Sequence, residues 1–328
     1  MPTRRDFLKH SAVTTAAGLV IGRDNNWQTA DRAAERLERI GVQLFSVPKL
    51  LERDFAGTMT MLAGIGFKEV EFFGPYPFSV ATAQERWNAI TPSLGFSGSG
   101  YFGLTAKQVR EILDRNGLSS PSMHVDLDTL RTRLGDVAEA AHVLGQRYAG
   151  IASIPLDERR TLDGYKRVAD EFNTIGERAA KVGLTFLYHN HGYGLSELEG
   201  QIPFKVVLER TDPKFVAMEM DIYWTTAGGA DPVAYLDAYP GRFRLMHVKD
   251  MVKRVRFSGD GGDPSQWEAL FPFMTTAGNG VLDLRAILSH AKRSGVQHFY
   301  VEQDLAPHPN EDLRRSFRYL AALELASR

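Results

Sequence analysis

Eight successive strand–helix units predict that most of this 328-residue chain forms one (β/α)8 barrel, the TIM-barrel class of α/β folds. Hydrophobic residues make up 43% and charged residues 24%, a balance that supports a large buried core and excludes a disordered chain. A glycine follows five of the predicted helices, where the chain has to turn back into a parallel strand. These glycines are Gly66, Gly117, Gly145, Gly183 and Gly295.

The strands are predicted from short runs that are rich in β-branched and aromatic residues. In chain order they cover residues 40–47, 68–73, 121–125, 148–154, 184–191, 215–224, 243–249 and 298–302. The helices are predicted from apolar positions at helical spacing, such as Val109, Ile112 and Leu113 within residues 105–116. Asp231 is the expected cap of a helix that begins at Pro232, because proline is common in the first helical turn. The other helices are expected over residues 54–65, 136–144, 161–182, 202–209, 284–293 and 313–325.

Two long insertions interrupt this alternation, at residues 74–103 and 251–281. Both follow a strand, so both are expected on the carboxyl-terminal face of the barrel, where TIM-barrel active sites lie. Loops of this length in compact domains usually serve as lids or binding loops. The alternative is a solvated excursion without a function.

An open, doubly wound sheet is the alternative fold. It would need a phosphate-binding glycine loop after the first strand, and Ser46-Val47-Pro48-Lys49 is not one. The formal net charge of −1 does not indicate nucleic acid or an anionic membrane as a partner. The absence of cysteine from the sequence excludes disulfides, thiolate metal sites and cysteine nucleophiles.

Residues 1–30 are interpreted as an export signal and linker, which leaves residues 31–328 as a single barrel domain. Arg4-Arg5, then Phe7-Leu8-Lys9 and a short, weakly apolar run, resemble a twin-arginine signal, with a basic amphipathic helix as the alternative. The run is too short for a permanent membrane anchor. No small-x-small cleavage site stands out before Asp31. A periplasmic or otherwise exported protein, with no membrane anchor after signal cleavage, is therefore expected.

Ionisable residues collect at the carboxyl ends of six predicted strands, where aliphatic residues would be expected inside a barrel. Alternate residues of a strand share a face, so His189 and His191 are expected to point together, as are Glu219 and Asp221. Imidazoles and carboxylates without thiolates suit Mn²⁺, Zn²⁺, Co²⁺ or Mg²⁺, which predicts a site for one divalent ion. The residues concerned are Glu71, His124, His189, His191, Glu219, Asp221, His247, Lys249 and Glu302.

Five motifs in this order resemble the xylose isomerase-like TIM barrel superfamily, in the branch of sugar phosphate isomerases/epimerases that includes inosose dehydratases. The resemblance covers residues 38–327 and is specific for the superfamily, not for a substrate. The motifs are Ile40-Gly41-Val42-Gln43-Leu44, Tyr188-His189-Asn190-His191, Met220-Asp221-Ile222-Tyr223-Trp224, His247-Val248-Lys249-Asp250 and Val301-Glu302-Gln303-Asp304.

The resemblance implies which residues bind the ion. Asp221, His247 and Glu302 match the family's ligands from its sixth, seventh and eighth strands. The fifth-strand position departs from the pattern, because many members have Glu-Asn-His where this chain has His189-Asn190-His191. His189 is the expected fourth ligand, with His191 as its rival. Epimerases of the family use two glutamates as proton shuttles, so this departure puts two-glutamate epimerisation in doubt.

The expected reaction is proton abstraction next to a carbonyl through an enediolate, by an isomerase or epimerase of an unphosphorylated sugar or keto-sugar. A lyase or dehydratase acting on a keto-sugar, keto-glycoside or inosose is the alternative. Glu302 or His191 is expected to remove the proton, and Lys249 or His124 to return one, with the pKa of Lys249 lowered beside the metal. Glu71, His124 and Trp224 are expected to bind the sugar.

Two other classes of function compete with this interpretation. Phosphodiester hydrolysis of the endonuclease-IV type needs several metals and a basic groove, whereas residues 31–328 carry more acidic than basic side chains. An exported sugar-binding barrel with a degenerate site is favoured only by the departure at His189. The expected partner is a small sugar, and homo-oligomer formation is left open.

Overall fold

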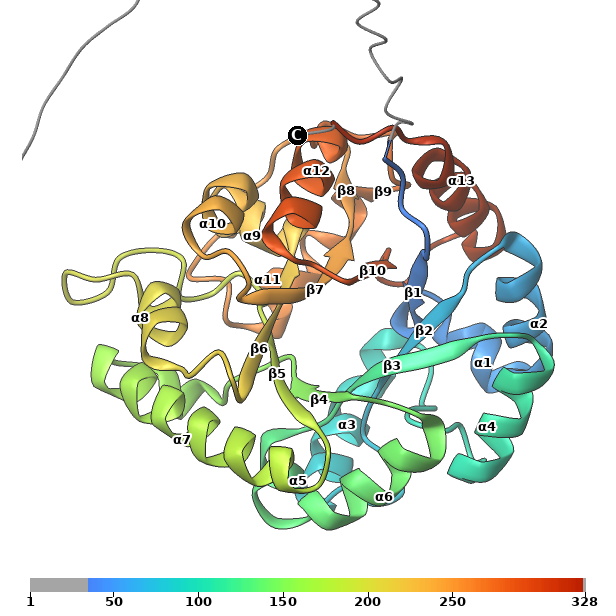
Figure 1. Cartoon of the computed structure of the whole chain (residues 1–328), viewed down its shortest axis with the longest axis horizontal. Helices are drawn as coiled ribbons and strands as arrows, with labels where there is room; N and C mark the ends of the chain where they lie inside the picture. Colours follow the sequence, from blue (N-terminus) through green and yellow to red (C-terminus); the bar gives the residue numbers. More distant parts are fainter. Residues whose placement is uncertain (1–34, 327–328) are drawn as a thin grey trace, which may run out of the picture. The chain divides into compact units, whose positions relative to one another are not determined.

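Eight parallel strands close into a barrel in the computed structural model, which describes residues 35–326 (Figure 1). Each strand pairs with its neighbours in the chain, and the last pairs with the first. The TIM-barrel class predicted from the sequence is confirmed, while the predicted signal and linker at residues 1–30 lie outside the described residues. The strands are β1 (Gly41–Gln43), β2 (Glu69–Phe73), β3 (Ser119–His124), β4 (Tyr148–Ile151), β5 (Thr185–His189), β6 (Val216–Asp221), β7 (Phe243–Val248) and β10 (His298–Val301).

A ring of helices surrounds the barrel, and the eight helices predicted from the sequence all belong to it (Figure 1). The five glycines that were expected to end helices all have positive φ angles, between 63° and 126°. This conformation lets the chain leave a helix and enter the next strand within a few residues. The eight helices are α2 (Phe55–Ile65), α4 (Ala106–Arg115), α6 (Leu134–Leu144), α7 (Leu162–Lys181), α8 (Pro203–Arg210), α10 (Pro232–Ala238), α12 (Leu284–Ser294) and α13 (Pro309–Ala322).

Several strands end earlier than the sequence predicted. β1 stops at Gln43, and a 3-10 turn and the short helix α1 (Pro48–Arg53) follow it. β6 stops at Asp221, because the Asp221 side chain accepts a hydrogen bond from Trp224 N (2.9 Å) and begins α9 (Ile222–Ala227). Of the strand predicted over residues 215–224, residues 216–221 form β6 and residues 222–224 begin α9, so Trp224 lies on the helix.

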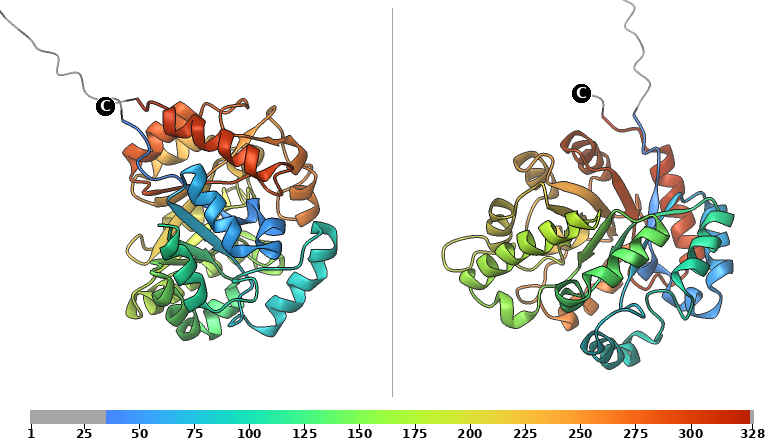
Figure 2. Two further views of the ribbon diagram at one scale, coloured as in Figure 1. Left: turned by 90° about the vertical axis from the view of Figure 1, so that its right-hand side faces the viewer. Right: turned by 60° about the horizontal axis from the view of Figure 1, so that its bottom comes forward.

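The two insertions contain secondary structure of their own. The first contains α3 (Ala81–Leu94), and a two-stranded antiparallel pair, β8 (Asp250–Met251) and β9 (Met274–Thr275), encloses most of the second. α11 (Pro264–Glu268) lies between these two strands. Both insertions lie on the same side of the barrel (Figure 2), and Ser93 Oγ of α3 lies 3.4 Å from Glu268 Oε1 of α11. A further short helix, α5 (Leu127–Thr132), follows β3.

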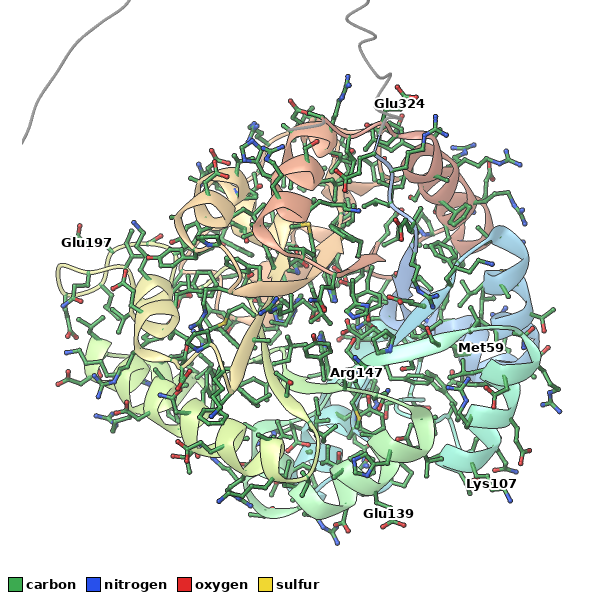
Figure 3. All side chains as sticks on the ribbon, in the orientation of Figure 1. Met59, Lys107, Glu139, Arg147, Glu197 and Glu324 are labelled. Atoms are coloured by element: carbon green, nitrogen blue, oxygen red, sulfur yellow. The ribbon has the colours of Figure 1, made fainter. Side chains whose placement is uncertain are left out.

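The main core lies between the strands and the ring of helices, and a small second cluster fills the barrel itself. The second cluster consists of Leu187, Ala217, Leu245 and Tyr300. Exposed charged side chains point away from the ring of helices, as Figure 3 shows for its labelled residues Lys107, Glu139, Glu197 and Glu324. Within residues 35–326, no helix combines the length and the apolar character that crossing a bilayer requires.

Gly150 of β4 is packed so closely that a side chain there should weaken the barrel. A Cβ atom at residue 150 would lie 2.1 Å from the backbone oxygen of Leu187, its register partner on β5. We expect Gly150→Ala to lower the free energy of unfolding by about 1–3 kcal/mol, because the two strands have to separate. Urea-induced unfolding measures this change.

Gly135 of α6 provides the matched control, because a Cβ atom there meets no other atom within 4 Å. Gly135→Ala should leave stability unchanged or raise it by up to about 1 kcal/mol, because alanine favours a helix over glycine. Equal losses of stability in the two variants would contradict the packing argument.

Candidate metal centre

Polar side chains from β3, β5, β6, β7 and β10 meet inside the barrel at or just after the carboxyl-terminal ends of those strands. The strand pairing places His189 of β5 beside Glu219 of β6, and Asp221 of β6 beside His247 of β7. All four side chains are at most 1% exposed. Burying this many ionisable groups costs free energy unless they pair with each other or with an ion. The complete set is His124, His189, Glu219, Asp221, His247, Lys249 and Glu302.

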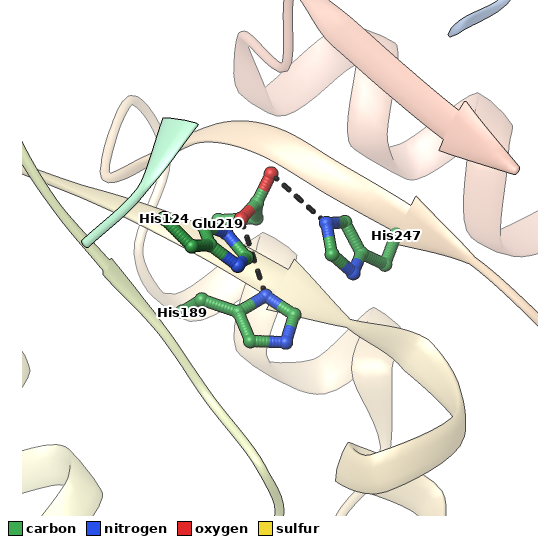
Figure 4. A group of neighbouring side chains, drawn as sticks. All are labelled: His124, His189, Glu219 and His247. Carbon is green, nitrogen blue, oxygen red and sulfur yellow. Dashed lines mark hydrogen bonds and ion pairs between the residues drawn. The ribbon is translucent and has the colours of Figure 1, made fainter. Parts of the chain in front are cut away.

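The carboxylate of Glu219 is the hub of the inner half of this cluster (Figure 4). His124 Nε2 lies 2.7 Å from Glu219 Oε2, and His189 Nδ1 lies 3.2 Å from the same oxygen. His247 Nε2 lies 3.4 Å from Glu219 Oε1. Burial raises the pKa of Glu219, but the three imidazoles outweigh this effect and hold the pKa well below its usual value. Glu219 therefore remains a carboxylate that orients three rings.

Glu71 holds the ring of His247 from below. Its Oε2 lies 2.6 Å from His247 Nε2 and accepts a hydrogen bond from Gln43 Nε2 (2.8 Å). Its Oε1 accepts a hydrogen bond from Ser122 Oγ. Because a carboxylate can only accept here, Nε2 of His247 carries a proton and Nδ1 is the nitrogen that faces the outer half of the cluster.

The outer half of the cluster brings together donor atoms that suit a metal ion. His247 Nδ1 lies 2.7 Å from Glu302 Oε2 and 3.9 Å from Asp221 Oδ2. His189 Nε2 also lies 3.9 Å from Asp221 Oδ2. Asp221 Oδ2 and His247 Nδ1 are both buried, and each has a charged neighbour, Lys249 Nζ at 3.0 Å and Glu302 Oε2 at 2.7 Å. Asp221, His247 and Glu302 offer atoms within 4.8 Å of one another, so they could share one ion.

A second possible group consists of His124, His189, Glu219 and His247. The inner nitrogens of these rings already face Glu219, and His124 is engaged with it at 2.7 Å. Burial lowers the pKa of His124, but Glu71 and Glu219 outweigh this effect and raise it. We therefore assign His124 and Glu219 a supporting role, as the carboxylates that orient metal-binding histidines usually have, while His189 and His247 turn their other nitrogens toward Asp221.

Lys249 lies beside the outer group and contacts three carboxylates. Its Nζ is 3.0 Å from Asp221 Oδ2 and 2.8 Å from both Glu302 Oε2 and Asp304 Oδ2. Burial lowers the pKa of Lys249, but the three carboxylates outweigh this effect and hold the pKa well above its usual value.

His191 and Trp224 form the outer wall of the site. Their rings lie 6.3 Å apart, and Trp224 also covers Lys249, with Nζ 5.1 Å from the centre of its ring. β5 ends at His189, so the alternation that predicted a common direction for His189 and His191 stops before His191. Burial lowers the pKa of His191 to about 3, so its ring is neutral at physiological pH.

The structure thus brings three of the four predicted ligands, Asp221, His247 and Glu302, within reach of one ion, with Lys249 beside them. The fourth, His189, lies 3.9 Å from Asp221 Oδ2 but belongs to the group around Glu219. Glu71 and His124, predicted to bind substrate, instead lie beneath the histidines. Sequence reasoning placed Glu219 on the same face as Asp221 but did not name it as a ligand, a base or a substrate contact. It also missed Asp304, which contacts Lys249.

Comparisons with known proteins agree with this architecture. The family model described as "Xylose isomerase-like TIM barrel" matches residues 60–323, and the model of the twin-arginine translocation signal matches residues 1–20. The second match indicates export by the twin-arginine route.

Curated relatives include an inosose dehydratase of Geobacillus thermodenitrificans, 27% identical over 170 residues. This match covers 49% of the chain and 56% of the relative, so the chain spans about half the length of that relative. Inosose dehydratase 2 of a Bacillus cereus strain is 25% identical over 263 residues, which cover 78% of the chain and 84% of the relative.

Solved structures show the same fold. A sugar phosphate isomerase/epimerase from Parabacteroides distasonis ATCC 8503 has a TM-score of 0.67 at 22% identity, covering 91% of this chain and 98% of that one. A structure of the IolI protein with a bound zinc atom has a TM-score of 0.59 at 12% identity, covering 85% and 94%.

Proposed function

The chain belongs to the xylose isomerase-like TIM barrel family, and from this premise we propose that it is a divalent-metal-dependent enzyme that removes a proton next to a carbonyl group of a sugar. The observation that carries the proposal is the convergence of buried donor atoms of Asp221, His247 and Glu302 beside the ammonium of Lys249. A metal ligand set next to a fixed proton donor suits this chemistry.

Four side chains would hold the ion, through His189 Nε2, Asp221 Oδ2, His247 Nδ1 and Glu302 Oε2. When bound, the ion would act as a Lewis acid that polarises the carbonyl group of the sugar. Two imidazoles and two carboxylates suit Zn²⁺, Mn²⁺ or Co²⁺ better than Mg²⁺, which prefers oxygen ligands. The zinc atom in the IolI structure supports this preference. Glu71 and Glu219 fix the ring orientations from beneath.

The base that removes the proton is Glu302 or His191. Burial raises the pKa of Glu302, but Lys249 and His247 outweigh this effect and hold it well below its usual value, so Glu302 is a carboxylate. His191 is neutral and, among the described residues, its buried Nδ1 has no hydrogen-bond partner. Both side chains can therefore accept a proton at physiological pH.

Lys249 is the proton donor in this proposal. His124, the other candidate, is engaged with Glu219 beneath the ligands, whereas Lys249 lies beside Asp221 and Glu302. Asp304 Oδ2 also accepts a hydrogen bond from the ammonium at 2.8 Å. Its raised pKa keeps Lys249 protonated, so it can pass a proton to an oxygen that leaves or becomes negatively charged.

Of the two outcomes of proton removal, elimination fits the side chains better than epimerisation. An epimerase needs matched bases on both faces of the substrate, and the fifth-strand position has His189 in place of a glutamate. One base and one ammonium acid instead suit a lyase, in which an oxygen substituent leaves from the neighbouring carbon. The inosose dehydratases among the relatives support this choice. An isomerase, which reprotonates the neighbouring carbon, is the second candidate.

The substrate we propose is an unphosphorylated keto-sugar or inosose. Export by the twin-arginine route places the enzyme where phosphorylated sugars are scarce. The half-buried ring of Trp267, which lies beside His191, offers an aromatic face of the kind that commonly packs on sugar rings.

The proposal is tested by incubating the enzyme, loaded in turn with Mn²⁺, Co²⁺, Zn²⁺ and Mg²⁺, with keto-sugars and inososes in deuterated water. We expect solvent deuterium in the recovered substrate or the product, and a conjugated ketone if a substituent is eliminated. A protein that holds metal but exchanges no deuterium would argue against proton removal. A protein without stoichiometric metal would favour the sugar-binding alternative.

A further inference from the structure

Residues 252–273, here called the lid, form a loop whose base is fixed. β8 and β9 pair on either side of it, and Val252 N donates a hydrogen bond to Phe273 O (2.9 Å). The buried carboxylate of Asp250 accepts hydrogen bonds from the backbone N–H groups of four residues and so holds the base together. These four residues are Met251, Gly278, Gly280 and Leu282.

Two aromatic side chains of the lid lie over the candidate metal centre. The ring of Phe257 stacks on Trp224, with centroids 5.5 Å apart and planes at 19°. The ring of Trp267 lies 4.7 Å from that of His191. Trp224 and His191 are the outer wall of the centre, so the lid covers the side from which a substrate would approach.

The tip of the lid is held by one buried arginine from the opposite side of the site. Arg159, which follows β4, donates a hydrogen bond from Nη2 to Gly262 O (2.5 Å) and from Nε to Ile154 O (3.0 Å). Its guanidinium lies 4.1 Å from the centre of the Tyr193 ring, in the segment after β5. The Arg159 side chain is only 2% exposed. One residue therefore joins the lid to two barrel segments.

Arg159 is an unusual buried charge, because its close partners are carbonyl groups. The carboxylate of Asp260 is 3.5 Å away and 62% exposed, so it is a weak partner. Buried arginines normally pair with a carboxylate, and carbonyl partners make the contact easier to break. The lack of a side chain at Gly262 lets the guanidinium approach this closely, because a Cβ atom there would lie 2.1 Å from Arg159 Nη1.

We propose that Arg159 is a positioning residue that latches the lid closed over the metal centre, and that the lid opens by releasing Gly262 O from the guanidinium. Closing the lid removes water from the site and places Phe257 and Trp267 against its outer wall. The proposal rests on the position of the site, not on the reaction proposed above, so its test does not require a substrate.

Trypsin cleavage of the native, full-length protein tests the latch, because the lid carries three exposed trypsin sites at Lys253, Arg254 and Arg256. We expect Arg159→Met to accelerate cleavage at these three sites by about tenfold, since cleavage of a native loop reports how often it opens. Mass spectrometry of the fragments identifies the cut sites. Arg159→Lys, which keeps the charge and part of the hydrogen bonding, should give an intermediate rate.

Arg242 supplies the matched control. It is also a buried arginine that donates to a backbone carbonyl, Thr211 O, but it lies before β7 at the other end of the barrel. Arg242→Met should lower global stability without accelerating cleavage in the lid. Equal lid cleavage in the Arg159→Met and Arg242→Met proteins would show that Arg159 only contributes to general stability and would overturn the proposal.

Gly262→Ala disrupts the same contact from the lid side, and it replaces Arg159→Met as the test variant if that protein does not fold. It should accelerate lid cleavage to the same extent, and the double variant should be no faster than either single one. Acrylamide quenching of Trp267 fluorescence, isolated by subtracting a Trp267→Phe protein, should rise in parallel. Unchanged quenching and cleavage in Gly262→Ala would contradict a latch at this point.

Discussion

An Asp221→Asn protein is expected to keep its barrel, to lose tight binding of the divalent ion, and to lose activity by about 1,000-fold or more. Asp221 Oδ1 accepts the hydrogen bond from Trp224 N that begins α9, and an asparagine can accept the same bond. Oδ2 is the oxygen that faces His189, His247 and Lys249. In asparagine an amide NH₂ takes its place and cannot bind a metal ion, so the exchange removes the ligand and keeps the helix cap.

Metal content per chain after dialysis, measured by mass spectrometry, is the direct readout. Asp231 provides the control, because it also caps a helix, α10, through a hydrogen bond from Val233 N, and it is exposed. Asp231→Asn should leave metal content, activity and stability unchanged. If Asp221→Asn retained one ion per chain with unchanged affinity, the ligand assignment would be wrong.

The fold could be predicted because its signals are local and repeat along the chain. The glycine that follows five of the eight helices, such as Gly145 after α6 or Gly295 after α12, marks a conformation that the backbone needs whatever the tertiary context. Residue patterns between these glycines then separate strand from helix. Eight repeats leave few ways of closing the sheet other than a barrel.

The ends of the strands could not be predicted as well, and the site depends on them. β5 was expected to reach His191 and β6 to reach Trp224, because the residue types continue the strand pattern. The Asp221 side chain competes for the next backbone N–H groups and begins a helix instead. Alternation along a strand therefore identified Asp221 and His189 but gave no valid direction for His191 or Trp224.

The supporting carboxylates were missed for a different reason. Which strand-end side chains bind an ion and which orient the ligands depends on their depth in the barrel and on the register between strands. Glu71, on β2, reaches His247, on β7, across the interior of the barrel. No spacing in the sequence encodes that contact, because the two residues are 176 positions apart. Glu219 was placed on the correct face, but its contacts with three imidazoles arise only when β3, β5 and β7 converge on it.

The lid itself could be predicted from the sequence, but the residue that holds its tip could be found only in the structure. The length of the insertion at residues 251–281 and its position after a strand predicted a lid or binding loop, and the structure places Phe257 and Trp267 over the outer wall of the site. The residue that holds its tip, Arg159, lies about 100 positions earlier and has no local pattern that distinguishes it from a surface arginine.

Lys249→Met should lower kcat by about 10²–10⁴-fold, the range that one general acid contributes, while the protein keeps its metal ion. Methionine has a similar length and fills the space without a charge or a proton. Removing the ammonium leaves Asp221 and Glu302 less neutralised, so affinity for a divalent cation should stay equal or rise. Lys292→Met, which removes a lysine of α12 paired with Glu35 at 3.0 Å, is the control and should leave kcat unchanged.

The dependence on the leaving group separates an acid from a residue that only balances charge. If Lys249 protonates the departing oxygen, Lys249→Met should lose most activity on keto-sugars whose substituent leaves as a strongly basic alkoxide. It should lose little on substrates with a weakly basic phenolate, which departs without a proton. The carboxylates of Asp221, Glu302 and Asp304 keep the pKa of Lys249 well above its usual value, so Lys249 stays protonated across neutral pH. The native enzyme should therefore not discriminate in this way between alkoxide and phenolate leaving groups in that pH range. Equal losses on both kinds of substrate would exclude Lys249 as the acid and leave it a purely electrostatic role.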